Sequence, residues 1–319
     1  MPSDTEPTMP LPPPRWRRLS GVAWAGVVVA GVAGLYIAYW MLAANRVDAG
    51  LRAWAAAQAD RGLEISFEDL DVGGFPLWLR AVIDAPAVAG QKGDRPWRWQ
   101  TGRMTLTARP WDLSRVRFDL SGHHELSLDK GDWQMDFAAT ASQLSGSVDR
   151  GGEDGSFLTL SIDAAGVTLP EEDDLPFGNL VTAAGLRARV LGPVPAAPWP
   201  DLLTGWRDAG GTIEIDRLHG DYGPLNIDLD GTVALDTEMQ PEGAATARVA
   251  GTGKALTALR DRGVITAADA ITARLVLMAL KRVPGADGRQ AVELPITLQD
   301  RILYAGPAAV ASLPRLVWK

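Results

Sequence analysis

Cysteine is absent from the 319 residues of the chain. Its absence excludes disulfide bridges, thiolate zinc sites and a thiol nucleophile. A chain without cysteine also avoids wrong disulfide pairing, which is compatible with export into an oxidising compartment. Histidine is scarce too: the three residues are His123, His124 and His219. His123 and His124 are adjacent in an expected strand and point to opposite faces, so we expect no shared metal site there.

Basic residues are fewer than acidic ones: the chain has 31 Lys and Arg and 39 Asp and Glu, which gives a formal net charge of −8. A nucleic-acid surface needs a basic face, so this class of protein is excluded. The segment Gly251-Thr252-Gly253-Lys254 lacks the spacing of a phosphate loop and is followed by Ala255. We therefore predict no catalytic residue, cofactor or metal, and we expect that the protein is not an enzyme. A hydrolase that uses scattered acids is the remote alternative.

One run is free of charge: residues 21–44 are apolar or small throughout. As a helix they would span about 36 Å, enough for a bilayer core of about 30 Å. Arg15, Arg17 and Arg18 precede the run, and basic residues stay cytoplasmic. We predict a disordered cytoplasmic tail over residues 1–20, a single transmembrane helix, and an exported remainder in the periplasm beside the inner membrane. A cleaved signal peptide is the alternative.

Residues 45–62 are rich in alanine and lack proline, and they predict a juxtamembrane helix that ends at Gly62. Val47, Leu51 and Trp54 form a stripe at helical spacing. We expect this stripe to pack on the following domain. The alternative is that it lies on the membrane surface.

From Leu63 the hydrophobic period changes from 3.6 to 2, and the turn Gly73-Gly74-Phe75-Pro76 interrupts the first run. Short strands joined by tight turns predict an antiparallel sheet. The fold class is therefore mainly β with a few helices (α+β), an extended and curved sheet. Strands are expected at residues 63–72, 77–83, 97–108, 115–120, 123–128, 133–138, 146–148, 157–162, 212–218, 225–235, 292–298 and 301–305, and helices at 201–208, 254–262 and 266–282.

Two stretches 148 positions apart are similar. Leu70, Pro76 and Leu77 correspond to Leu218, Pro224 and Leu225, with apolar residues at both flanks. A duplication predicts two related β-rich units, residues 63–165 and 166–319. Chance similarity is the alternative, because alternation and turn residues are common.

Tryptophan is frequent, with 12 residues. Trp97, Trp99, Trp111 and Trp133 fall in the first β-rich stretch, and the period of two places Trp97 and Trp99 on one face. They predict either core packing or an aromatic-lined apolar groove for an acyl chain or another hydrophobic ligand.

The chain resembles the domain of unknown function 2125 family of Gram-negative envelope proteins. The resemblance rests on the N-terminal anchor, the Gly74-Phe75-Pro76 turn, and the series Leu294-Pro295-Ile296-Thr297-Leu298-Gln299-Asp300, Leu303-Tyr304-Ala305-Gly306-Pro307 and Leu313-Pro314. It implies no catalytic residue, because that family has no established activity. More distantly, the architecture is similar to AsmA-type envelope proteins, which are implicated in lipid movement.

These features predict a membrane-anchored periplasmic protein that binds a hydrophobic ligand or lipid in an apolar groove of its sheet. The alternative is an envelope assembly protein that uses a sheet edge, or the Pro76 and Pro224 turns, to hold another protein.

The predicted orientation has a direct test. Alkaline phosphatase fused after Lys319 should be active, because it folds with its disulfides only outside the cytoplasm. A fusion after Pro14 serves as the inactive control. Activity of the Pro14 fusion alone would contradict the orientation.

Overall fold

The computed structural model of the protein describes residues 21–92, 95–129, 134–140, 143–151, 156–169, 175–198, 201–285 and 288–318. The chain divides into two compact units, residues 1–43 and 44–319. Each unit is described by itself.

One helix, α1 (Gly21–Gln58), contains both the predicted span and most of the predicted juxtamembrane helix. It continues into the 3-10 helix η1 (Ala59–Arg61). Gly62 then ends the helix in the left-handed conformation, with φ 75°, which glycine adopts without a steric penalty. By length and composition, α1 is able to cross a membrane.

The part of α1 in the second unit packs on the sheet. Leu51 contacts the buried cluster of Leu70, Ala81 and Ile83. The buried residues of α1 are Ala44, Ala55 and Gln58, which share the helix face of Leu51. The expected stripe is therefore correct for Leu51 and wrong for Trp54, which is exposed. Small residues, rather than the tryptophan, let the helix approach the strands closely.

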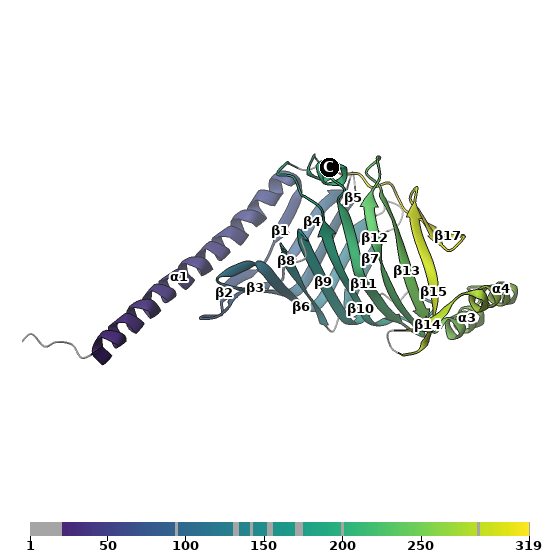
Figure 1. The fold of residues 1–319 in the computed structure, drawn as a ribbon, viewed down its shortest axis with the longest axis horizontal. Helices are drawn as coiled ribbons and strands as arrows, with labels where there is room; N and C mark the ends of the chain where they lie inside the picture. Colours follow the sequence, from purple (N-terminus) through teal and green to yellow (C-terminus); the bar gives the residue numbers. More distant parts are fainter. Residues whose placement is uncertain are drawn as a thin grey trace, which may run out of the picture. The chain divides into compact units, whose positions relative to one another are not determined.

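The described residues form one sheet of 17 strands, in which every pairing is antiparallel (Figure 1). The predicted fold class is confirmed. The strands are β1 (Leu63–Ser66), β2 (Asp69–Gly73), β3 (Leu79–Asp84), β4 (Ala87–Lys92), β5 (Arg95–Arg109), β6 (Asp112–Asp129), β7 (Gln134–Thr140), β8 (Gln143–Arg150), β9 (Leu158–Thr168), β10 (Leu180–Leu191), β11 (Thr212–Tyr222), β12 (Leu225–Leu235), β13 (Pro241–Ala250), β14 (Arg282–Pro284), β15 (Gln290–Gln299), β16 (Ile302–Ala305) and β17 (Ala308–Ser312).

The long hairpin of β5 and β6 is the branch point of the sheet. On one side of β5, β4 pairs with its first half and β3 with its second half. On the far side of β6, β7 and β8 divide the strand in the same way. A register shift between Thr101 and Arg103 marks the division, and Gly122 lies opposite it with φ 94°. A bulge of this kind bends a strand and increases its twist.

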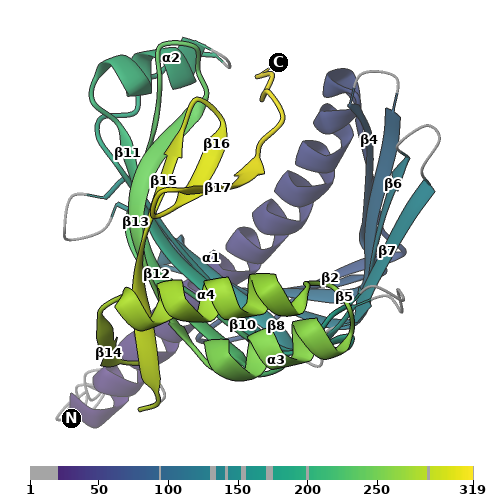
Figure 2. The same cartoon turned by 90° about the vertical axis from the view of Figure 1, so that its right-hand side faces the viewer.

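From β8 onward the sheet is a simple meander. The pairing order is β8, β9, β10, β11, β12, β13, β15, β16 and β17, with β14 beside the start of β15. Figure 2 shows the sheet bent into an open curve. The accumulated right-handed twist of many neighbouring strands produces this curvature.

Three helices interrupt the strands: α2 (Asp201–Asp208), α3 (Thr252–Asp261) and α4 (Ala267–Ala279). The predicted bounds of α2 are confirmed, and α3 and α4 lie within two residues of the predicted starts. At α4 the Thr266 hydroxyl accepts from the Asp269 amide while the Asp269 carboxylate accepts from the Thr266 amide. This reciprocal pair is the capping box that the sequence indicates.

Five strands had no counterpart in the sequence prediction: β4, β10, β13, β14 and β17. All of them except the short β14 are rich in alanine and glycine, which have weak β propensity, so pairing with neighbours decides their conformation. The strands expected at 115–120 and 123–128 are one strand, β6. The boundary proposed at residue 165 falls inside β9. The proposed duplication stays a prediction, although both of its stretches are antiparallel hairpins, β2–β3 and β11–β12.

Close packing around Gly146 predicts that a side chain at this position destabilises the protein. A Cβ at Gly146 would lie 2.2 Å from the Ser161 carbonyl O and 2.4 Å from Phe118 Cζ. We expect Gly146→Ala to lower the free energy of unfolding by about 1–3 kcal/mol, because the backbone must move. The control is Gly220→Ala, where a strand glycine has no atom within 4 Å of the added Cβ. Urea denaturation followed by tryptophan fluorescence measures both. Equal stability of the two variants would contradict the packing.

Candidate functional site

The sheet has one apolar and one polar face, and β12 illustrates the division. Ile227 and Leu229 alternate with Asp228 and Asp230 along the strand, and alternate residues point to opposite faces. The register continues this separation, since Ile227 is opposite Val249 of β13 while Asp228 is opposite Arg248.

Register extends the apolar face from β2 to β16. The register shift beside Thr101 places its extra residue in β6, because one residue separates Thr101 from Arg103 while two separate Ser121 from His124. β5 keeps its alternation, so the register places only its second half on this face. The apolar face contains Leu70, Val72, Leu79, Ala81, Ile83, Met104, Leu106, Val116, Phe118, Leu120, Leu144, Val148, Leu158, Leu160, Ile162, Leu186, Ala188, Val190, Ile213, Ile215, Leu218, Ile227, Leu229, Val233, Ala245, Ala247, Val249, Val292, Leu294, Ile296, Leu298 and Leu303.

The opposite face carries ion pairs between neighbouring strands. Asp84 pairs with Arg103, Arg115 with Asp149, Arg189 with Asp216, Arg217 with Asp228, and Arg248 with Asp230. The hydrogen bond from Arg248 to Asp230 raises the pKa of the guanidinium. Each pair is partly exposed, so its contribution to stability is small. The polar face is therefore solvated, and the two faces are chemically distinct.

Little of the apolar face is covered by protein. Among the described residues, the buried core cluster is confined to Leu70, Ala81 and Ile83, with Leu51 of α1 against it. Between β8 and β15 most large apolar side chains of the face are only half-buried. The exceptions are Val292 of β15 and Trp206 of α2, which packs against Gly211 before β11. In Figure 2 the last turns of α1 lie inside the curve of the sheet, so the face that Leu51 contacts is the concave one.

Trp97 and Trp99 lie half-buried on one side of the first half of β5, opposite Gly90 and Val88 of β4. A Cβ at Gly90 would lie 2.8 Å from Leu63 Cδ2 and 3.0 Å from the Trp97 ring. Gly90 therefore gives Trp97 the room to contact Leu63 across the strand. This pair of tryptophans fits either reading of the sequence, as packing or as a surface for an apolar ligand.

Trp111 is not brought together with Trp97 and Trp99. It lies in the turn after β5, about 40 Å along the strand from Trp99, and it is exposed. Because β5 is one long strand, Trp111 and Trp99 are far apart in space although they are close in sequence. Trp133 lies outside the described residues.

Trp111 belongs instead to a cluster of side chains from two turns. The Arg109 guanidinium lies 5.1 Å from the Trp78 ring centre and 5.6 Å from that of Trp111. The Ser114 hydroxyl donates to the Asp112 carboxylate and lowers the pKa of that exposed acid. Such cation–π contacts bring the two aromatic rings to the same arginine.

The predicted structural turns lie where expected. Gly73 ends β2, Gly74 has φ 100°, and the Phe75–Pro76 peptide is cis. A Cβ at Gly74 would lie 2.8 Å from the Trp78 carbonyl O, so this tight turn requires glycine. Pro224 lies in the turn between β11 and β12.

A cavity of about 380 Å³ lies where α3, α4 and β15 meet, and Gly251-Thr252-Gly253-Lys254 forms one wall of it. The cavity is lined by four basic residues, Lys254, Arg274, Arg282 and Arg289, and by apolar residues including Met278 and Val292. Val292 belongs to the apolar face, so the cavity adjoins that face at one end of β15. The sequence singled out the glycines of this segment but not the distant arginines, because tertiary contacts bring them together.

The histidines lie apart from each other. His124 is buried, with Nδ1 2.7 Å from the Thr101 hydroxyl at the bend of β5 and β6, and His219 lies on β11. The side chain of His123 is outside the described set. Over the described ranges, no three His, Asp or Glu side chains gather closely enough to hold a metal ion.

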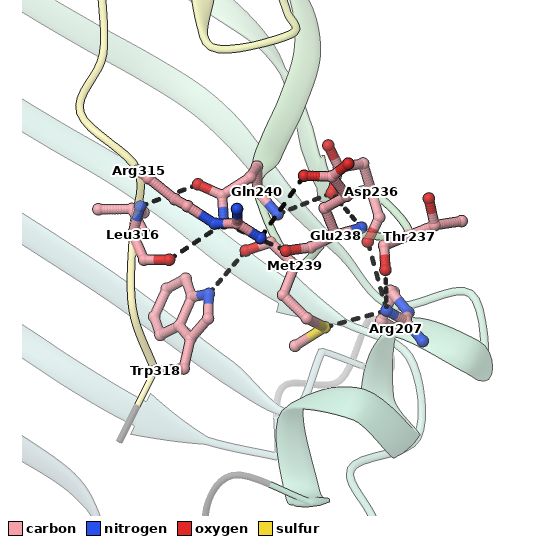
Figure 3. Close-up of polar contacts among 9 residues, drawn as sticks. All are labelled: Arg207, Asp236, Thr237, Glu238, Met239, Gln240, Arg315, Leu316 and Trp318. Atoms are coloured by element: carbon pink, nitrogen blue, oxygen red, sulfur yellow. Dashed lines mark hydrogen bonds and ion pairs between the residues drawn. The ribbon is translucent and has the colours of Figure 1, made fainter.

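The last residues of the chain are fastened to the turn between β12 and β13 (Figure 3). The side-chain amide of Gln240 accepts from the Leu316 amide at 2.8 Å and donates to its carbonyl at 3.0 Å. The Trp318 indole donates to the Met239 carbonyl at 2.6 Å, and Arg207 of α2 donates to the Thr237 carbonyl at 3.2 Å. The turn between β12 and β13 thus forms hydrogen bonds with both α2 and the C-terminal segment.

This fastening predicts a specific effect of Gln240, which is 3% exposed. We expect Gln240→Ala to lower the free energy of unfolding by about 1–3 kcal/mol, because the Leu316 amide and carbonyl lose their hydrogen-bond partner. Hydrogen exchange of residues 313–318 should become fast while that of β12 stays slow. Gln299→Ala, in an exposed position on β15, is the control. Unchanged exchange in residues 313–318 would contradict the role of Gln240.

Comparison with known proteins places the chain in one family. A family model described as "Uncharacterized protein conserved in bacteria (DUF2125)" matches residues 40–149 and 124–314. No match was found among curated proteins or solved structures. The matched residues include the turn around Pro76 and the C-terminal series from Leu294. The chain belongs to the DUF2125 family of bacterial proteins.

Proposed function

We propose that the protein is a non-enzymatic, single-span protein of the inner membrane whose periplasmic sheet binds lipid on its concave apolar face. The uncovered apolar face from β8 to β15 carries this proposal. Apolar surfaces of this size on a folded protein mark a binding site. Covering about 100 Å² of such surface contributes about 2.5 kcal/mol, so an acyl chain along several strands would bind well.

The basic cavity supports an amphiphilic ligand with an anionic head. Among the described residues Lys254, Arg274 and Arg282 form no ion pair with an acid, so their charges are available to a ligand. Val292 links the cavity to the apolar face. A ligand with its head at these cations could lay its chains across β15 and β13.

The inner-membrane location and the orientation rest on the arginines before α1. The orientation matters to the proposal, because a sheet held beside the outer surface of the membrane has lipid within reach. A helix of this length also supports membrane association by itself.

A scaffold for another envelope protein is the second candidate. The edge strand β17 pairs only with β16 among the described strands, and all five of its residues are exposed. An exposed edge with small side chains can accept a strand from a partner.

Photocrosslinking from the two faces of one strand separates these functions. Benzoylphenylalanine replaces Ile296 on the apolar face or its neighbour Thr297 on the polar face, in the full chain expressed in cells. We expect lipid adducts by mass spectrometry from the Ile296 position and none from Thr297. The contrast arises because the two side chains point to opposite sides of β15.

The outcomes discriminate clearly. A protein adduct from Ile296, or from a probe at Val310 on β17, would favour the scaffold. Equal lipid labelling at Ile296 and Thr297 would indicate nonspecific membrane contact and count against the proposal. Arg274→Gln with Arg282→Gln should reduce adducts of anionic lipid more than those of neutral lipid, while the matched change Arg260→Gln, at a position paired with Asp261, should not.

A further inference from the structure

An exposed apolar cluster occupies the turns after β2 and β5. Phe75, Leu77 and Trp78 come from the first turn, and Trp111 and Leu113 from the second. Leu77 is 57% exposed and Trp111 is 53% exposed. These five residues are called the turn cluster. β3 and β5 are neighbours, and Arg109 lies between the rings of Trp78 and Trp111, so the two turns form one surface.

The chain after Gly62 runs back along α1. β1 lies beside η1, and further along, Arg52 donates to the Leu70 carbonyl at 3.1 Å and lies 5.7 Å from the centre of the Phe67 ring. The strand path from Leu63 to Leu70 is therefore antiparallel to the last turns of the helix.

This arrangement sets the level of the turn cluster along the helix axis. From Leu70 to Gly73 a strand advances about 10 Å, which is the length of about seven residues of helix. Counted back from Arg52, seven residues reach Asn45, next to Ala44, where the apolar span ends. Ala44 is itself 6% exposed, so protein covers the helix at this level. Within the unit of residues 44–319, the turn that follows Gly73 therefore lies level with Ala44 and Asn45, the residues at the end of the uncharged run.

We propose that the turn cluster inserts into the interfacial layer of the bilayer that α1 spans. Tryptophan and phenylalanine favour the boundary between headgroups and acyl chains. Three arginines on the flanking strands, Arg80, Arg109 and Arg117, provide positive charge for anionic headgroups in a chain that is acidic overall. The insertion fixes the sheet at a second point and holds the start of the apolar face at the lipid surface. It rests on membrane anchoring and is independent of lipid binding by the sheet.

The test uses the absence of cysteine, which permits a single label. Leu77→Cys, Asp60→Cys and Leu35→Cys are each labelled with an environment-sensitive fluorophore in the full chain, reconstituted in phosphatidylcholine vesicles with and without phosphatidylglycerol. Asp60 is the matched control, since it lies in the helical segment η1 that continues α1, about 24 Å along the helix axis from Ala44. Leu35 reports whether α1 is in the membrane. Lipids with a spin label near the headgroup act as the quencher.

We expect about twofold quenching at Leu77, at a depth of about 5–10 Å below the headgroups, and none at Asp60. Trp111→Glu with Phe75→Glu should abolish quenching at Leu77 but leave that at Leu35. Quenching at Leu35 without quenching at Leu77 would overturn the proposal while leaving the anchor intact, and loss of both would overturn the anchor and the proposal together. A blue shift at Leu77 that appears without lipid and grows with protein concentration would also overturn it, as the sign of a protein partner.

Discussion

Alternation of side chains in a pleated strand is the constraint on which this structure depends. From β2 and β3 through the second half of β5 to β16, the strands of the apolar face present apolar residues to one side and polar residues to the other, and the register keeps the two sets apart. A single layer cannot bury its own apolar face. Most antiparallel sheets solve this problem with a second sheet or with helices. Among the described residues, α1 covers the start of the face at Leu70, Ala81 and Ile83, and Trp206 of α2 covers Gly211 at one end.

The polar face shows why the sheet is stable in this form. Ion pairs such as Arg189 with Asp216 and Arg217 with Asp228 connect adjacent strands, while hydrogen bonds of the ladders hold the backbone. These contacts need no burial, so they remain when one face is open. The apolar side is therefore where covering the exposed surface would lower the free energy, which is the basis of the proposed lipid site.

The first strands return along the end of the N-terminal helix. The helical segment stops at Gly62, and the chain turns back beside it through β1 and β2. Packing by Leu51 and the hydrogen bond from Arg52 to Leu70 hold the last turns of α1, from Ala44 onward, against the start of the apolar face.

Sequence reasoning was accurate where a local signal was strong. The uncharged run, the stop at Gly62, the capping box at Thr266 and the alternation in β12 each depend on neighbouring residues, and each is present in the structure. It missed β4, β10, β13 and β17, whose alanine and glycine residues carry little periodic signal, and the short β14. The distance of Trp111 from Trp97 and Trp99 was not visible in the pattern, because it depends on the length of β5.

The sequence by itself thus determined that the chain has an apolar helix, an antiparallel sheet and strands with one apolar side. Only the tertiary structure decided that these sides form one continuous face, and that the described elements leave most of it open. The physical reason is register: whether Ile227 faces Val249 or a polar residue depends on pairing between strands, and a shift of one residue would reverse it. The basic cavity and the turn cluster likewise depend on contacts between segments distant in sequence, which no local pattern encodes.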